Sequence, residues 1–98
     1  MFSIYKLCVY SIVKDEMQNI DRYLSMVESA DEVVILDTGS TDGTYEYLKA
    51  KESDKIKVYQ KHYDLFRFDT ARNDALALTS DKCDIYISIE PDMILCKN

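Results

Sequence analysis

Short apolar runs rich in β-branched residues alternate with amphipathic segments along this chain, and that alternation is what most constrains its fold. Four runs predict buried strands, at residues 7–13, 33–36, 56–59 and 84–89. In the segments between them, apolar residues lie three and four positions apart, which is typical of helices that pack on one side. Strands separated by helices predict a single α/β domain over residues 1–98, with a parallel β-sheet and helices on both faces.

Polar residues near the start of each amphipathic segment predict where the helices begin. Asp15 with Gln18 has the spacing of a helix cap, in which a side chain accepts a hydrogen bond from a free backbone N–H. Any of residues 40–42 can cap the second helix, and Asp69 or Thr70 can cap the third.

The charge of the chain argues against two classes of partner. Its 98 residues carry a formal net charge of −6, which disfavours non-specific binding to nucleic acid or to an anionic membrane surface. No apolar run approaches the ~20 residues of a membrane span. The first residues also lack a charged leader followed by an apolar stretch, so we expect no signal peptide.

The cysteines indicate a reducing compartment. Cys8, Cys83 and Cys96 are odd in number and contain no C-x-x-C pair. We therefore expect neither a disulfide framework nor a zinc site, and we expect a cytoplasmic protein. Cys8 and Cys83 are interpreted as small apolar groups of the core.

Acidic residues follow the predicted strands at the edge of the sheet where ligands usually bind. Glu16 follows the first strand, Asp37 ends the second, and Glu90 and Asp92 follow the fourth. Glu90 and Asp92 are two positions apart, so an extended chain points both carboxylates the same way. Oxygen ligands of this kind suit Mg²⁺ or Mn²⁺, although acidic residues at strand ends are also common without a metal.

The segment of residues 37–44 holds both glycines of the chain in a polar turn between a strand and a helix. Glycine permits a tight turn there. Asp37 can accept hydrogen bonds from a ligand, whereas residues 40–44 are equally well explained as a capped turn. The chain contains neither a G-x-G-x-x-G dinucleotide loop nor a G-x-x-x-x-G-K-[ST] phosphate loop.

Four stretches together resemble the N-terminal, nucleotide-sugar-binding half of a family 2 glycosyltransferase. They are residues 8–16 (CVYSIVKDE), 33–44 (VVILDTGSTDGT), 68–75 (FDTARNDA) and 86–95 (YISIEPDMIL). They are similar to the family's first strand, its D-x-G-S-x-D-x-T turn, its A-R-N-x-A helix start and its D-x-D metal motif. The resemblance implies a GT-A, Rossmann-like fold and a UDP-sugar as the usual donor.

The resemblance also implies roles for single residues. Val13 and Glu16 would lie beside the base and ribose, Asp37 would hydrogen-bond the base or ribose, and Arg72 would reach the nucleotide. Thr38 occupies the position where many members have a second acidic residue, and we expect it to be one of the nucleotide-binding residues.

Two further residues of the resemblance concern a metal. Asp92 would be the principal ligand of Mn²⁺ or Mg²⁺, with Glu90 assisting. This chain has Glu-Pro-Asp in place of the family's Asp-x-Asp, so metal binding depends more on Asp92 than on Glu90.

The family's acceptor-binding half and its usual catalytic base lie beyond the motifs found here. We therefore expect a nucleotide-sugar-binding half with no assigned catalytic residue, in the lineage of an inverting transferase. The alternative is a non-catalytic nucleotide-binding or interaction module. A phosphate-accepting receiver domain is disfavoured, because residues 59–61 (YQK) provide no aspartate after the third strand. The apolar residues 93–95 suggest a homodimer through the C-terminal edge.

Overall fold

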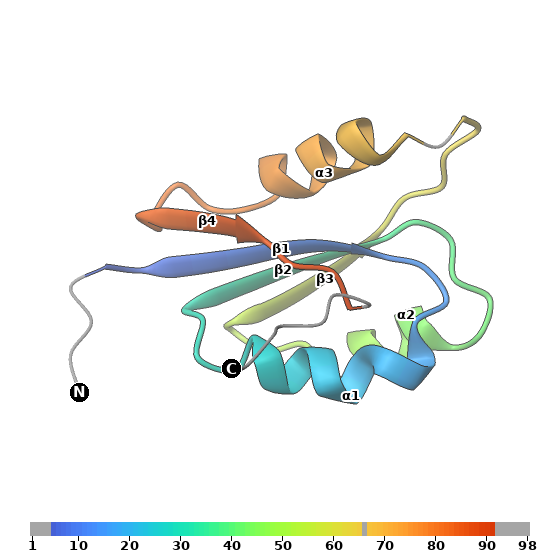
Figure 1. The fold of residues 1–98 in the computed structure, drawn as a ribbon, viewed down its shortest axis with the longest axis horizontal. Helices are drawn as coiled ribbons and strands as arrows, with labels where there is room; N and C mark the ends of the chain where they lie inside the picture. Colours follow the sequence, from blue (N-terminus) through green and yellow to red (C-terminus); the bar gives the residue numbers. More distant parts are fainter. Residues whose placement is uncertain (1–4, 66, 92–98) are drawn as a thin grey trace, which may run out of the picture.

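The structure is a computed structural model that describes residues 5–65 and 67–91. Its strands are β1 (Leu7–Val13), β2 (Glu32–Asp37), β3 (Ile56–Gln60) and β4 (Ile85–Ser88), and its helices are α1 (Met17–Met26), α2 (Thr44–Lys49) and α3 (Phe68–Ala77). The strands form one all-parallel sheet, with α1 and α2 on one face and α3 on the other (Figure 1). The predicted α/β class is confirmed.

The strand order is β3-β2-β1-β4. Rossmann-type sheets have the order 3-2-1-4, whereas receiver-type sheets have 2-1-3-4-5. The observed order therefore argues further against a receiver domain. The chain moves outward from β1 to β3 and then returns to place β4 on the other side of β1, so the strand order reverses between β1 and β4.

The core has two layers, because side chains of a strand point alternately to the two faces of the sheet. Toward α1 and α2, the larger cluster consists of Val9, Val13, Ile20, Tyr23, Val27, Ala30, Val33, Ile35, Leu48 and Val58. Toward α3, the smaller cluster consists of Ile12, Leu36, Ala71 and Ala75. Two small alanines let α3 pack closely on the sheet, and together the layers hold the carboxyl ends of β1 and β2 in place.

The predicted caps of α1 and α3 are wrong. Glu16 precedes α1 without a side-chain cap, and Asp15 lies in the left-handed region with φ 53°. The Asp15 carboxylate instead accepts a hydrogen bond from the Thr41 N–H at 2.7 Å, because the loops after two neighbouring parallel strands meet at one edge. Arg67 precedes α3 with an extended backbone, so the helix begins before either predicted cap residue.

The predicted cap of α2 is correct in part. Gly43 occupies the cap position with φ 94°, where no side chain is available. Asp42, one residue earlier, accepts the Thr44 N–H at 3.0 Å. A residue of the predicted segment therefore satisfies a free N–H of this helix.

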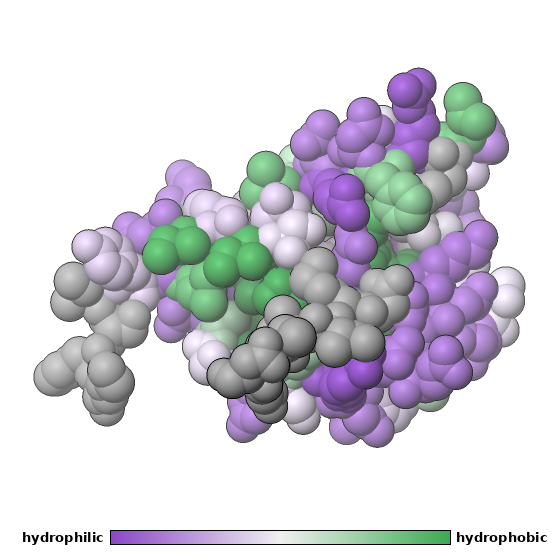
Figure 2. All heavy atoms as spheres, viewed as in Figure 1, coloured by the Kyte–Doolittle hydropathy of each residue, from purple (hydrophilic) through white to green (hydrophobic). Residues whose placement is uncertain are grey.

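β4 lies at an edge of the sheet and is shorter than predicted. Ile85 and Ile87 are 44% and 41% exposed, and apolar side chains gather around β4 in Figure 2. The predicted apolar segment 93–95 and the predicted metal ligand Asp92 lie outside the described residues. No helix in the described ranges has the length and apolar character that crossing a membrane requires.

Candidate functional site

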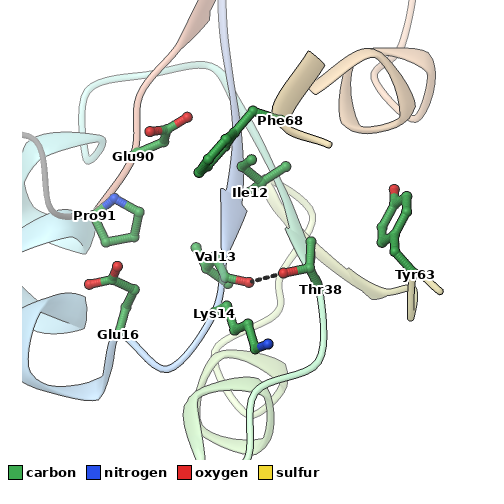
Figure 3. A pocket seen from close by; sticks show the side chains of 9 residues that line it. All are labelled: Ile12, Val13, Lys14, Glu16, Thr38, Tyr63, Phe68, Glu90 and Pro91. Carbon is green, nitrogen blue, oxygen red and sulfur yellow. Dashed lines mark hydrogen bonds between the residues drawn. The ribbon is translucent and has the colours of Figure 1, made fainter. Parts of the chain in front are cut away.

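A pocket of about 310 Å³ opens at the carboxyl ends of β1, β2 and β4, where the strand order reverses (Figure 3). It is lined by Ile12, Val13, Lys14, Glu16, Thr38, Tyr63, Phe68, Glu90 and Pro91. Its volume is at the small end of the range for ligand sites, roughly 300–1,000 Å³. A group of the size of a nucleoside fits this space better than a complete nucleotide sugar does.

The predicted nucleotide-binding residues separate into two groups in the structure. Val13, Glu16, Thr38 and Glu90 line the pocket. Asp37 and Arg72 are not lining residues, but each is next to one. Asp37 precedes Thr38 in the sequence, and Arg72 donates a hydrogen bond to Glu90.

Hydrogen bonds between neighbouring segments hold the floor of the pocket. The Thr38 N–H and hydroxyl both donate to the Val13 carbonyl, at 2.9 and 3.3 Å, and Figure 3 marks the hydroxyl bond. Glu16 accepts a bond from the Asn19 amide at 2.9 Å and donates its own N–H to the Thr44 hydroxyl at 3.0 Å. The ends of β1 and β2 and the start of α1 are thus held together before any ligand binds.

Asp37 is fully buried, and its two carboxylate oxygens have different surroundings. Oδ1 accepts the N–H groups of Gly39 and Ser40, both at 2.8 Å, and the Gln60 amide at 3.3 Å. Oδ2 is buried without a hydrogen-bond partner among the described residues. A buried polar atom without a hydrogen-bond partner costs free energy. This oxygen can therefore accept a hydrogen bond from a further donor group.

Both glycines of the turn need their conformational freedom. Gly39 has φ 121° and Gly43 has φ 94°, a region that other residues rarely adopt. A Cβ atom on Gly39 would lie 3.2 Å from Nδ1 of His62. His62 is exposed and lies beside this turn, in the loop between β3 and α3.

The loops after β1 and β2 are joined by bonds between side chains and backbone. Ser40 accepts the Asp15 N–H at 2.8 Å, and Asp42 accepts the Met17 N–H at 3.3 Å. With the Glu16 N–H bond to the Thr44 hydroxyl, these contacts satisfy N–H groups just before and at the start of α1, while the Asp15 carboxylate satisfies the Thr41 N–H. Residues 40–44 therefore have a structural role beside the pocket.

Arg72 is directed at Glu90. Its Nε and Nη2 both donate to Oε2 of Glu90, at 2.8 and 2.5 Å, and its guanidinium lies 5.5 Å from the centre of the Phe68 ring. The pair joins the start of α3 to the segment after β4. Arg72 therefore forms an ion pair within the protein, and its predicted nucleotide contact stays a prediction.

Sequence reasoning assigned no site role to several residues of the lining, above all Lys14, Tyr63 and Phe68. Phe68 is 59% exposed, and an exposed aromatic ring beside a pocket suits stacking against a planar ligand. The sequence did contain a signal for Phe68, because this residue begins the helix that carries the A-R-N-x-A motif. Tyr63 lay in a segment without periodicity, and its hydroxyl donates to Asp74 at 2.6 Å. Burial and this contact raise the pKa of Tyr63 to about 12.

The predicted metal site at this edge has Asp92 as its principal ligand, and because Asp92 lies outside the described residues the site stays a prediction. In the parts of the chain that the structure describes, the one cluster able to hold an ion is Cys8, Glu32 and Cys83, at the opposite end of the sheet. A hard cation at the pocket would depend on Glu90, whose carboxylate suits it chemically, together with Asp92.

Comparison with known proteins gives one match. Residues 8–89 match the model of a family described as glycosyl transferase family 2. No curated protein and no solved structure matches the chain. The matched range runs from β1 to just past β4, so it includes the described sheet except Leu7 and most of the pocket lining.

Proposed function

The chain belongs to glycosyl transferase family 2, and from this we propose that its pocket binds the nucleoside part of a nucleoside diphosphate sugar, UDP-sugar being the expected donor. The pocket lies at the strand-order reversal, where Rossmann-like sheets bind nucleotides. Its volume suits the nucleoside, which leaves the diphosphate and sugar to extend past Glu90 and Pro91 toward solvent.

The observation that carries this proposal is the unpaired Oδ2 of buried Asp37. A nucleobase N–H or a ribose hydroxyl is a donor of the kind this oxygen lacks. Oδ2 is covered in the structure, so a ligand would reach it through a local shift of the turn. The Gln60 contact at 3.3 Å is the longest bond to this carboxylate and the easiest to give up.

Other residues of the site have matching roles in the proposal. The Phe68 ring would stack on the base, and Val13 and Thr38 would form the floor beneath it. Arg72 would exchange part of its contact with Glu90 for the nucleotide, since its planar fork of donors can serve two acceptors. Lys14 lines the pocket and would supply a positive charge to the bound nucleotide.

The proposal extends to a divalent metal and to inverting transfer. Glu90 and Asp92 would hold Mn²⁺ or Mg²⁺, which when bound offsets the charge of the departing diphosphate. We assign no residue as the base that deprotonates the acceptor. For this chain the proposed activity is therefore donor binding, with transfer as the reaction of its lineage.

Calorimetric titration of UDP into the chain, with and without Mn²⁺, tests the proposal. Asp37→Asn is the informative variant, because an asparagine Oδ1 can still accept the two turn N–H groups while its amide replaces the acceptor Oδ2. We expect binding to weaken by about tenfold or more, as for a lost bond to a charged group.

Asp54→Asn is the matched control, since Asp54 is exposed and precedes β3 at the other end of the sheet. It should bind UDP as the parent chain does. Absence of UDP binding under both conditions, or equal binding by folded Asp37→Asn, would overturn the proposal. Asp92→Ala separately tests the metal: its loss of the Mn²⁺ effect is expected.

A further inference from the structure

The amino end of the sheet, opposite the pocket, brings together two thiols and a carboxylate. Cys8 lies near the start of β1, Glu32 begins β2, and Cys83 precedes β4. Cys8 and Glu32 are partners in the β1–β2 register. One ligand atom from each of the three residues lies within 4.8 Å of the other two.

We propose that Cys8, Glu32 and Cys83 form a binding site for a thiophilic divalent cation, Zn²⁺, with water as the fourth ligand. Two thiolates and a carboxylate are a donor set that zinc accepts, whereas Mg²⁺ and Mn²⁺ prefer oxygen. Binding exchanges protons for metal: each thiol releases its proton to solvent and forms a Zn–S bond, and nothing is oxidised or reduced.

The distances suit a tetrahedral site. Zn–S and Zn–O bonds of about 2.3 and 2.0 Å, at a tetrahedral angle, separate a sulfur from an oxygen by about 3.5 Å and two sulfurs by about 3.8 Å. Sγ of Cys83 lies 3.5 Å from Oε1 of Glu32. That pair already has the required separation. The sulfur of Cys8 lies at most 4.8 Å from the other two ligand atoms, so a shift of about 1 Å would bring it to a tetrahedral distance.

The carboxylate is held in position from behind. The Ser80 hydroxyl donates to Oε1 of Glu32 at 2.6 Å, and the Ser80 N–H donates to Oε2 at 3.1 Å. The Tyr86 hydroxyl in turn donates to the Ser80 carbonyl. Hydrogen bonds that orient a ligand in this way are typical of metal sites.

The cluster has a definite place in the fold. Its residues come from three segments, and among the described strands β4 pairs only with β1. A bound cation would tie the segment before β4 to both β1 and β2. It would thus stabilise the position of β4, the short edge strand that leads to Glu90 and Pro91. The cation itself would lie away from the nucleotide pocket.

Titration of the reduced full chain with Zn²⁺ and, separately, with Co²⁺ tests this proposal. We expect one equivalent to bind, cobalt to show the absorption of a tetrahedral thiolate complex, and the thermal midpoint to rise. At free zinc of 100 times the dissociation constant, that rise is roughly 10–20 °C for a domain of this size.

Variants of the two more accessible ligands make the test specific. Cys83→Ser and Glu32→Gln, each shown to be folded by circular dichroism, should lose at least about tenfold in affinity. Asp81→Asn is the control, because Asp81 is an exposed carboxylate in the same loop. Cys96→Ser should retain the cobalt–thiolate absorption, since the site uses the other two thiols.

Several results would overturn the site. They are absence of the cobalt–thiolate absorption, an equal loss of affinity in Asp81→Asn, or loss of the absorption in Cys96→Ser. A Cys8–Cys83 disulfide found by mass spectrometry in chain prepared without reductant, together with no metal binding by the reduced chain, would show that the two thiols have another role.

Discussion

Asp37 has a structural role, and in the proposed function the same side chain also has a binding role. Oδ1 holds the turn after β2 through two backbone N–H groups, while Oδ2 has no partner in the described structure. The two roles can be separated by choosing the replacement. Asparagine keeps an acceptor for the turn, and alanine removes it.

We therefore expect Asp37→Ala to be less stable than Asp37→Asn by about 1–3 kcal/mol, the cost of leaving buried donors without a partner. Urea denaturation of both variants measures this difference. Equal stability of the two variants would show that Oδ1 does not hold the turn.

The two glycines of the turn differ in a way that substitution can measure. Gly39→Ala combines a disfavoured φ with a Cβ atom 3.2 Å from His62, whereas Gly43→Ala has the disfavoured φ alone. Each φ costs about 1–3 kcal/mol in a non-glycine residue, and we expect Gly39→Ala to be the more destabilising. Adding His62→Ala to Gly39→Ala should recover only the part due to crowding, as measured by thermal unfolding. Full recovery would contradict the argument from φ.

At the scale of the elements, Asp42 connects the starts of two helices. It accepts the Thr44 N–H and hydroxyl at α2 and the Met17 N–H at α1. These bonds, that of the Thr44 hydroxyl first, hold the pKa of Asp42 below its ordinary value of 3.8. The folded chain thus binds this proton less readily than the unfolded chain does.

A lowered folded-state pKa means that the contribution of Asp42 is present above pH 3.8 and is lost as the pH falls through the folded-state pKa. At neutral pH we expect Asp42→Ala to cost about 1 kcal/mol, as for other lost helix caps. Urea denaturation at pH 7 and at pH 3 measures the free energy of unfolding of this variant and of the parent chain. We expect the difference between the two to be smaller at pH 3. A difference that stays constant would mean that the charge of Asp42 does not contribute.

The elements themselves were largely predictable, and their junctions were not. The apolar runs defined β1 and β2 within a residue or two, because strands buried on both faces leave a strong local signal. The Asp15 cap failed because its carboxylate bonds to Thr41, which lies 26 positions away. A contact that depends on the neighbouring loop has no signal in the local sequence.

The same limit applies to the two ends of the sheet. The motifs placed Val13, Glu16, Thr38 and Glu90 at one edge, and the structure has all four in the pocket. Cys8 and Cys83 are far apart in the sequence and were interpreted as apolar core groups. Their approach to Glu32 follows from the strand order, which the sequence pattern does not determine.

At the scale of the whole molecule, β4 leaves one side of the sheet without a described neighbour. Ile85 and Ile87 are exposed there, and an open apolar edge favours pairing with another strand. We expect two copies of the chain to associate through this edge, and Ile87→Lys to weaken the association. Size-exclusion chromatography with light scattering measures this, and a strict monomer at high concentration would contradict it.

The central claim is that the carboxyl end of the sheet binds the nucleotide of a nucleotide sugar. Titration of the ¹⁵N-labelled chain with UDP and Mn²⁺, followed by amide NMR, tests it most directly because it locates the ligand. The account predicts the largest shifts at Val13, Lys14, Thr38, Gly39 and Glu90, with little change around Cys8 and Glu32. Absence of shifts, or shifts confined to the opposite end of the sheet, would contradict it.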